Sequence, residues 1–177
     1  MIEIKDLWAK DVKKISKLIN KLHKMHDKVG VEKEVEKLIG FFYQPIPKKK
    51  KKEKELYFLQ WSAYKTLLAI IKSNNEYVAD FKKDLIRLSR NSNKNISERA
   101  RDLIKKGNIK IGNEKCLYLQ LSDFKELIID KNKIDIKEIS ESLQINDDEA
   151  LDWIKQLIEE KKIDAYISNE RVHLTNT

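Results

Sequence analysis

Two stretches of this chain follow the same pattern, and this duplication constrains the fold more than any other feature. Residues 104–119 run from a predicted helix end into a short apolar strand, a turn at Asn113 and Glu114, and a second strand. Residues 158–174 repeat that order around Asn169 and Glu170. A helix that leads directly into a small hairpin is typical of one end of a compact helical unit. Two copies therefore predict two such units in tandem.

Apolar spacing completes both units. In the first, three amphipathic helices precede the hairpin, or wing, at 109–119. In the second, a helix, a short extended stretch at 134–136 and two further helices precede the wing at 163–174. Asn146 and Glu149 form a capping box at the start of the last helix. We therefore predict a mainly α fold with small β wings (α+β), built from two tandem winged-helix domains.

The predicted domain boundaries divide the chain into four parts. An N-terminal amphipathic helical segment covers 1–40, a linker rich in aromatic, proline and lysine residues covers 41–54, and the winged-helix domains cover 55–121 and 122–177. The apolar stripe of the first helix repeats at intervals of four and three: Trp8, Val12, Ile15, Ile19, Leu22, His26 and Val29. Two interpretations stay open, because such a helix packs on its own domain or binds a partner.

The linker carries two candidate contact segments. Its first half is extended and aromatic, since prolines bar a helix there, and it either lies on its own protein or docks into another one. The docking candidates are Phe41, Phe42, Tyr43, Pro45 and Pro47. Its second half is a lysine run, which is a solvated linker or a contact for an anionic surface such as lipid or nucleic acid. That run consists of Lys48, Lys49, Lys50, Lys51 and Lys52.

Charge is distributed unevenly along the chain. The 177 residues carry a net charge of +8. Residues 1–122 contain 29 Lys and Arg against 15 Asp and Glu, whereas residues 123–177 contain 8 against 14. The basic part therefore has a net charge of +14 and the acidic part a net charge of −6. Such asymmetry indicates different partners for the two ends.

No residue pattern of an enzyme is present. The four glycines do not form a phosphate-binding loop, and the three histidines have no nucleophile or metal-ligand spacing around them. We therefore expect no enzymatic activity, no cofactor and no metal. The single cysteine, Cys116, is predicted to be a small core residue in the first wing, and it fits a reducing compartment. With no apolar run of membrane-spanning length, we expect a cytoplasmic protein.

The two predicted recognition helices differ in charge. In the second domain, the helix surface is acidic and would be repelled by phosphates, so it favours a basic protein partner. The candidate residues there are Asp147, Asp148, Asp152, Lys155 and Glu159. In the first domain the corresponding helix is basic and keeps DNA binding open. Its candidate DNA contacts are Lys94, Arg99, Arg101 and Lys105.

The order of these features resembles the small winged-helix subunit of the ESCRT-II membrane-sorting complex. The matching segments are Phe41, Phe42, Gln44 and Pro45 ahead of a helix with Trp61; then Lys105, Lys106, Gly107 and Asn108; then Leu117, Tyr118, Leu119 and Phe124; and last Asp148, Glu149, Ala150 and Leu151. The resemblance covers residues 41–174. It implies a distant relative of that subunit with the same two-domain plan.

The resemblance also implies partners. In that family the first domain and the segment before it hold the subunit to larger ESCRT-II subunits, and the second domain recruits a basic ESCRT-III-type subunit on a membrane. This chain would then be a peripheral adaptor in membrane remodelling or sorting. Two alternatives stay open: a winged-helix transcriptional regulator that binds DNA through its basic first domain, and the winged-helix tail of PCI-type scaffolds or ligase adaptors, which residues 134–174 fit about as well.

Overall fold

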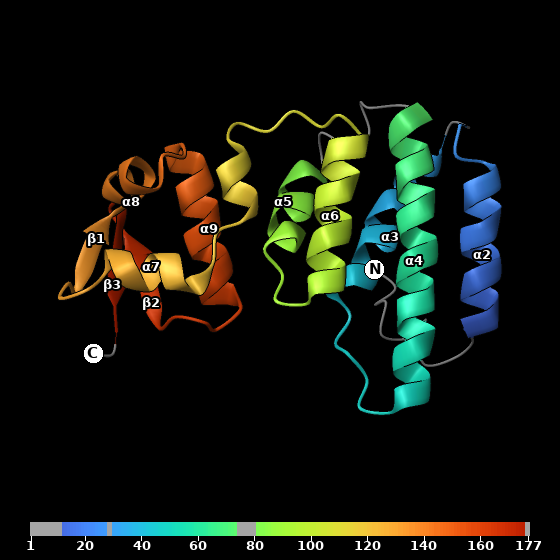
Figure 1. Cartoon of the computed structure of the whole chain (residues 1–177), viewed down its shortest axis with the longest axis horizontal. Coiled ribbons are helices and arrows are strands. Elements are labelled where there is room, and N and C mark those ends of the chain that lie inside the picture. Colours follow the sequence, from blue (N-terminus) through green and yellow to red (C-terminus); the bar gives the residue numbers. More distant parts are fainter. Residues whose placement is uncertain (1–11, 28–29, 74–80, 176–177) are drawn as a thin grey trace. The chain divides into compact units, whose positions relative to one another are not determined.

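The computed structural model describes residues 12–27, 30–73 and 81–175 (Figure 1). The chain forms two compact units. The N-terminal unit comprises residues up to Leu88 together with Ser92–Ile109, and the C-terminal unit comprises Ser89–Asn91 and Lys110–Thr177. By sequence, the N-terminal unit holds 26 Lys and Arg against 14 Asp and Glu, a net charge of +12. The C-terminal unit holds 11 against 15, a net charge of −4.

The described residues of the N-terminal unit form helices and connecting segments, with no strand among them. Its helices are α2 (Val12–Lys24), α3 (Val35–Gly40), α4 (Lys50–Ser73), α5 (Lys82–Ser89) and α6 (Lys94–Lys106), with the short 3₁₀ helices η1 (Val31–Glu34) and η2 (Phe41–Tyr43). Helix α4 is central, because α2, α3 and α6 all contact it. The apolar residues of α4 are fully buried at Leu56, Leu59, Ala63, Leu67 and Ile70.

Helix α2 lies along α4, so its predicted apolar stripe packs on the chain itself. Ile15 and Ile19 are buried, and Leu22 and His26 are half-buried. Trp8 and Val29, the two ends of the predicted stripe, lie outside the described residues. In the described part of the chain, α2 therefore packs on its own unit, which is one of the two interpretations of this helix.

The predicted first wing is wrong. Residues 109–119 are all described, and they form no strand; in their place is a 3₁₀ helix, η4 (Glu114–Leu117). The backbone of this segment is used elsewhere: the Ser89 hydroxyl donates to Leu117 O at 3.1 Å, and Arg90 Nε donates to Cys116 O at 2.6 Å. Asn113 accepts from Lys115 N and so starts η4. A hairpin ladder cannot form when its carbonyl groups bind side chains instead.

This correction moves the predicted domain boundaries. The division between units falls at residues 109 and 110, not at 121 and 122, because the segment that follows Ile109 packs in the C-terminal unit. The segment 1–40, where described, and the predicted linker 41–54 belong to the same unit as α4 to α6. Part of that linker is helical, since α4 begins at Lys50. The structure therefore does not have the wing that was predicted for the first of the two winged-helix domains.

The C-terminal unit has the element order predicted for the second domain. After η4 come α7 (Leu121–Leu127), β1 (Lys133–Asp135), α8 (Ile136–Leu143), α9 (Asp147–Glu159), β2 (Ala165–Ser168) and β3 (Arg171–Leu174). The strands form an antiparallel sheet in the order β1-β3-β2. The described residues of the two units are mainly helical with one small sheet, which is an α+β fold.

The core of this unit lies between the sheet and its helices. Phe124 of α7 and Trp153 of α9 are fully buried, and their rings meet edge to face with centroids 6.2 Å apart. The predicted capping box is confirmed: Glu149 N donates to Asn146 Oδ1 at 2.8 Å, and Asn146 N donates to Glu149 Oε2 at 3.3 Å. This box fixes the start of α9 and hence the position of Trp153.

Cys116 is buried as predicted, but in η4 and not in a strand. Burial, reinforced by the charge of Glu149, raises the pKa of its thiol from 9.0 to about 11. Since the thiolate is the reactive form, we expect the native thiol to react with a disulfide reagent at pH 8 roughly 100-fold more slowly than the unfolded chain. A colour assay with and without urea measures both rates. Equal rates would show that the Cys116 thiol is accessible to the reagent in the folded chain and contradict its burial.

Candidate partner-binding surface

Strand β2 forms an open edge of the sheet. It pairs with β3, and no other strand in the described part of the chain pairs with it. Thr175 N donates to Asp164 O at 3.0 Å, so residues 164 and 175 are a hydrogen-bonded pair just outside the ladder. Because such pairs alternate along antiparallel strands, Ala165 and Ile167 point their backbone N–H and C=O groups away from β3. These groups face the open edge.

The turn between β2 and β3 agrees with this register. Asn169 and Glu170 both have positive φ angles, 49° and 61°. A two-residue hairpin with positive φ at both positions is a type I′ turn, which is flanked by a hydrogen-bonded pair. Ser168 and Arg171 are that pair. The open edge is therefore held in register by its own turn.

The two sheet edges differ in chemistry. Strand β1 is three residues long and carries Lys133 and Asp135, and Asp135 binds Arg171 at 2.6 Å. Strand β2 has the sequence Ala-Tyr-Ile-Ser, with no charge and no proline. Natural proteins usually protect free edges with charges or proline, so an uncharged free edge favours pairing with another strand. Tyr166 of β2 is half exposed and stacks on His173 with centroids 4.9 Å apart.

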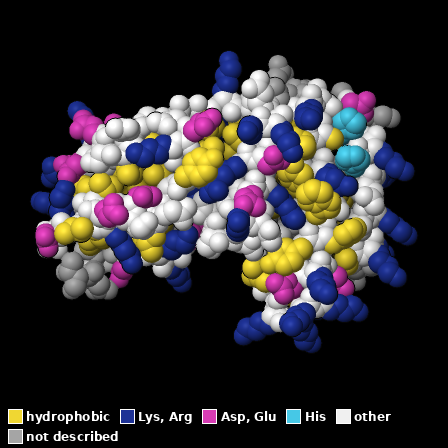
Figure 2. Space-filling view, in the orientation of Figure 1, with side chains coloured by type: hydrophobic (Ala, Val, Ile, Leu, Met, Phe, Trp, Pro, Cys, Tyr) yellow, Lys and Arg dark blue, Asp and Glu magenta, His cyan; other side chains and the backbone are white. Residues whose placement is uncertain are grey.

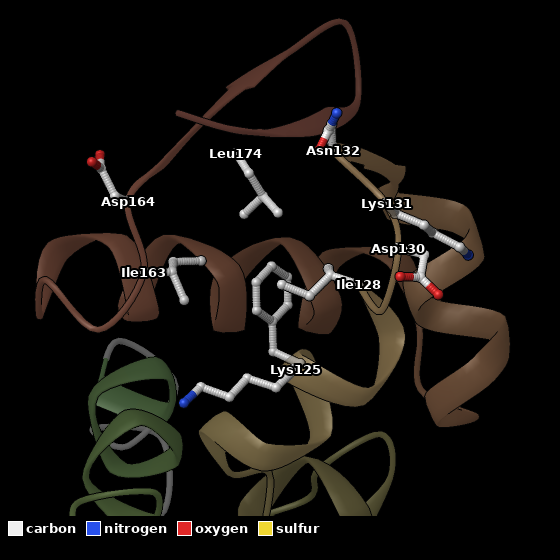
Figure 3. Close-up of a pocket in the computed structure, with 9 residues that line it drawn as sticks. Lys125, Ile128, Asp130, Lys131, Asn132, Ile163, Asp164 and Leu174 are labelled. Atoms are coloured by element: carbon white, nitrogen blue, oxygen red, sulfur yellow. The ribbon is translucent and has the colours of Figure 1, made fainter. Parts of the chain in front are cut away.

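A depression of about 560 Å³ lies beside the start of β2 (Figure 3). Its apolar lining comes from Phe124, Ile128, Ile163 and Leu174. Figure 3 shows Ile128, Ile163 and Leu174 directed toward its centre. The remaining lining residues are polar or charged: Lys125, Asp130, Lys131, Asn132 and Asp164. Since Leu174 pairs with Ala165, the depression adjoins the open edge and extends the surface that a partner could cover.

The predicted acidic surface of α9 is partly formed. Asp148, Asp152, Lys155 and Glu159 follow one another at intervals of four, three and four, so they share a stripe. Asp147 lies off this stripe and accepts a hydrogen bond from the Ser140 hydroxyl. The stripe therefore brings together four of the five predicted residues, but one of them is a lysine, so its surface is mixed in sign.

Asp152 is also less available than predicted. It is half-buried, and its charge acts on the buried guanidinium of Arg90. Burial lowers the pKa of Arg90, and the carboxylates of Asp152 and Glu149 oppose that shift. Arg90 additionally donates from Nη1 to Gln156 Oε1 at 3.2 Å. The charge of Asp152 thus acts on a buried group of this unit. The exposed acidic residues of the stripe are Asp148 and Glu159.

The comparison with protein families matches part of this unit. Residues 118–175 match the PCI domain family. The match runs from just before α7 to the end of β3, which is about a third of the chain, and it includes the open edge and the depression. Searches of curated proteins and of solved structures found no significant match. Of the three readings of the sequence, the PCI match agrees with the one based on residues 134–174.

The predicted docking segment of the N-terminal unit is buried only at its first two residues, and Tyr43 remains exposed. Phe41 and Phe42 are buried, and Gln60 Nε2 donates to Phe41 O at 3.0 Å. The Tyr43 hydroxyl contacts Asp84, at 3.1 Å from its carboxylate. Phe41 and Phe42 therefore lie in the unit's own core, and docking of a partner through this segment stays a prediction. Pro45 is exposed and Pro47 is half-buried.

The predicted DNA contacts do not form one surface. Lys94, Arg101 and Lys105 follow one side of α6, whereas Arg99 turns toward α4 and lies over the Trp61 ring. Lys94 and Lys105 are exposed, and Arg101 is half-buried. The lysine run 48–52 is exposed at every position.

Within residues 12–27, 30–73 and 81–175, no group of His, Cys, Asp or Glu side chains could hold a metal ion. Among the helices of those same residues, none has the length and apolarity needed to cross a bilayer.

Proposed function

We propose that this chain is a non-enzymatic subunit that joins a protein complex through its C-terminal unit. The observation that carries the proposal is the PCI match over residues 118–175. PCI domains mediate protein–protein interactions within complexes, and the matched residues include an uncharged open edge strand. The function that these features support best is assembly.

The open edge of β2 is the proposed contact. An extended segment of a partner adds to a sheet by hydrogen bonding to free backbone groups, and neighbouring pockets select its side chains. Ala165 and Ile167 supply the backbone groups, and the depression that adjoins Ala165 supplies the pocket. Tyr166 adds an exposed aromatic ring, a residue type that is enriched at interfaces.

Replacing Ala165 with proline tests this contact. Proline removes the outward N–H of that position, and an edge strand tolerates it because this group makes no bond to β3. We expect the Ala165→Pro chain to fold normally and to bind its partner about tenfold or more weakly. A partner strand cannot pair with β2 where the donor is missing and a proline ring projects. Tagged wild-type and variant chains, recovered from cells of the source and compared by quantitative mass spectrometry, measure the loss.

The matched control is Ala165→Val, which keeps the N–H and adds a side chain of similar bulk. Proteins that stay with the wild type and with Ala165→Val, but not with Ala165→Pro, are the partners of the edge. If the proline variant, shown to be folded by circular dichroism, recovers the same proteins in the same amounts, then β2 is not the assembly contact.

The ESCRT-II-like adaptor remains a narrower form of this proposal. It is supported by Asp148 and Glu159, the exposed acids of α9, which suit a basic ESCRT-III-type subunit. Its support is confined to the C-terminal unit, because the first wing and the buried Phe41 and Phe42 depart from the expected plan. In the assay above, an Asp148→Lys, Glu159→Lys chain shows whether the acidic stripe or the strand edge holds the partner.

A further inference from the structure

Helix α4 carries a stripe of exposed lysines and aromatic residues that the assembly surface does not use. Its residues are Lys50, Lys54, Phe58, Trp61 and Lys65, spaced by four, four, three and four. All five are exposed, and the two aromatic side chains retain 54% (Phe58) and 45% (Trp61) of their accessible area. At 1.5 Å per residue, the stripe is about 22 Å long. We call it the α4 stripe.

The packing of α4 leaves this stripe facing outward. The opposite side of the helix is buried against α2, α3 and α6. None of the five positions is acidic, and the two glutamates of α4, Glu53 and Glu55, are half-buried beside the stripe. Two large aromatic side chains are thus about half exposed on this side of the helix.

Cations surround the aromatic centre of the stripe. Arg99 of α6 lies over the Trp61 ring, with its guanidinium carbon 5.4 Å from the ring centroid. Lys65 Nζ lies 5.8 Å from the same centroid, and the Tyr64 ring stacks on the indole at 5.3 Å. Arg99 Nη1 is buried and has no hydrogen-bond acceptor among the described residues. Both the exposed lysines and this guanidinium suit an anionic ligand.

The segment that leads into α4 continues the same chemistry. Ile46 is half exposed, and the lysine run 48–52 follows it directly. Figure 2 shows dark blue side chains gathered around the lower end of α4, with yellow side chains beside them. The whole N-terminal unit has a net charge of +12. Exposed apolar side chains and a high density of lysine thus occur together.

We propose that the α4 stripe binds the surface of an anionic bilayer. In this arrangement Phe58 and Trp61 enter the headgroup region, while Lys50, Lys54 and Lys65 contact the lipid phosphates and carboxylates. Helices that lie on membranes combine aromatic residues on one face with lysines along its border. Each lysine near such a surface adds to the attraction, and neighbouring lysines of the run 48–52 strengthen it.

A bilayer fits the stripe better than a single-stranded nucleic acid does. Bases bind proteins by stacking on free aromatic faces inside a basic groove. Here the indole of Trp61 already has Tyr64 stacked on it and two cations over it, so a base would have to displace one of them. The interface of a bilayer needs only the exposed edge of the ring.

Vesicle sedimentation with the full chain tests the proposal. We expect binding to vesicles of about two parts phosphatidylcholine to one part phosphatidylserine, and little binding to phosphatidylcholine alone. The Lys50→Glu, Lys54→Glu chain should bind at least about 30-fold more weakly, because each substitution removes an attraction worth about fivefold in affinity and adds a repulsion. Phe58→Ser, which changes no charge and replaces a largely exposed side chain, should bind roughly fivefold more weakly.

The matched control places the same charge change on α6. Lys94→Glu, Lys105→Glu alters two exposed lysines of the same unit and should bind less than about threefold more weakly. Equal losses in the control and the stripe variant would mean that net charge alone drives binding, and the stripe assignment would fail. Tighter binding to a uridine oligonucleotide than to the vesicles would assign the surface to nucleic acid instead. Neither result affects the proposed assembly contact, which lies in the other unit.

Discussion

Replacing Trp153 with alanine is expected to lower the free energy of unfolding of the C-terminal unit by about 3–5 kcal/mol. The side chain is 1% exposed and meets the fully buried ring of Phe124 edge to face. Its loss removes the largest buried side chain of the unit and leaves a cavity that α7 and α9 cannot fill without moving. A small unit with ordinary stability has little left after such a loss.

Hydrogen exchange measured by mass spectrometry resolves the effect within the full chain. Peptides from α9 and β3 should lose most of their protection, whereas peptides from α4 in the N-terminal unit should keep it. The matched control is Tyr166→Ala, which removes an exposed aromatic side chain of the same unit and should change stability by less than about 1 kcal/mol. Equal effects of the two substitutions would contradict the core position of Trp153.

The sequence predicted the C-terminal unit well because its signals are local and agree with one another. Asn146 and Glu149 start α9 by hydrogen bonds across three residues, and Asn169 with Glu170 turns the hairpin. The apolar positions of α9 at Ala150, Ile154 and Leu157 follow helical spacing. Each of these features needs only near neighbours in the sequence to form.

The prediction of the first wing was wrong because residues distant in the sequence determine the conformation of that segment. Residues 109–119 alternate and contain a glycine–asparagine turn signal, just as a hairpin does. In the structure, Ser89 and Arg90 bind its carbonyl groups, and Asn113 Nδ2 donates to Gln144 O. These partners lie tens of residues away, so neither spacing nor turn chemistry can reveal them.

For the candidate surfaces, too, the sequence predicts features that depend on local spacing and misses those that depend on long-range contacts. Spacing alone places Asp148 and Glu159 on one side of α9, but it cannot show that the charge of Asp152 acts on the buried Arg90. That β2 lies at an open edge depends on the strand order β1-β3-β2, which is a property of the folded sheet. The α4 stripe can be recognised in the sequence. Its residues, on the side opposite the apolar ones, repeat at helical spacing: Lys50, Lys54, Phe58, Trp61 and Lys65.

Arg90 makes two hydrogen bonds to residues that are distant in the sequence. Replacing it with methionine should be strongly destabilising. It is 4% exposed, and it donates to Cys116 O at 2.6 Å and to Gln156 Oε1 at 3.2 Å. Methionine fills similar volume but leaves both acceptors buried without their donor. Because hydrogen bonds from a charged group contribute about 1.5–3 kcal/mol each, loss of the two bonds should cost roughly 3–6 kcal/mol in the C-terminal unit.

The fluorescence of Trp153 reports this loss during urea unfolding, since it is the one tryptophan of the C-terminal unit. To remove the signals of the N-terminal unit, Trp8 and Trp61 are replaced with phenylalanine in every chain compared. The matched control is Arg171→Met, which breaks a half-exposed ion pair with Asp135 and should cost less than about 1 kcal/mol. If Arg90→Met proves as mild as this control, the hydrogen bonds of Arg90 do not hold η4 in place. A loss of the expected size would show that the hydrogen bonds from Arg90 to Cys116 O and Gln156 Oε1 stabilise the C-terminal unit.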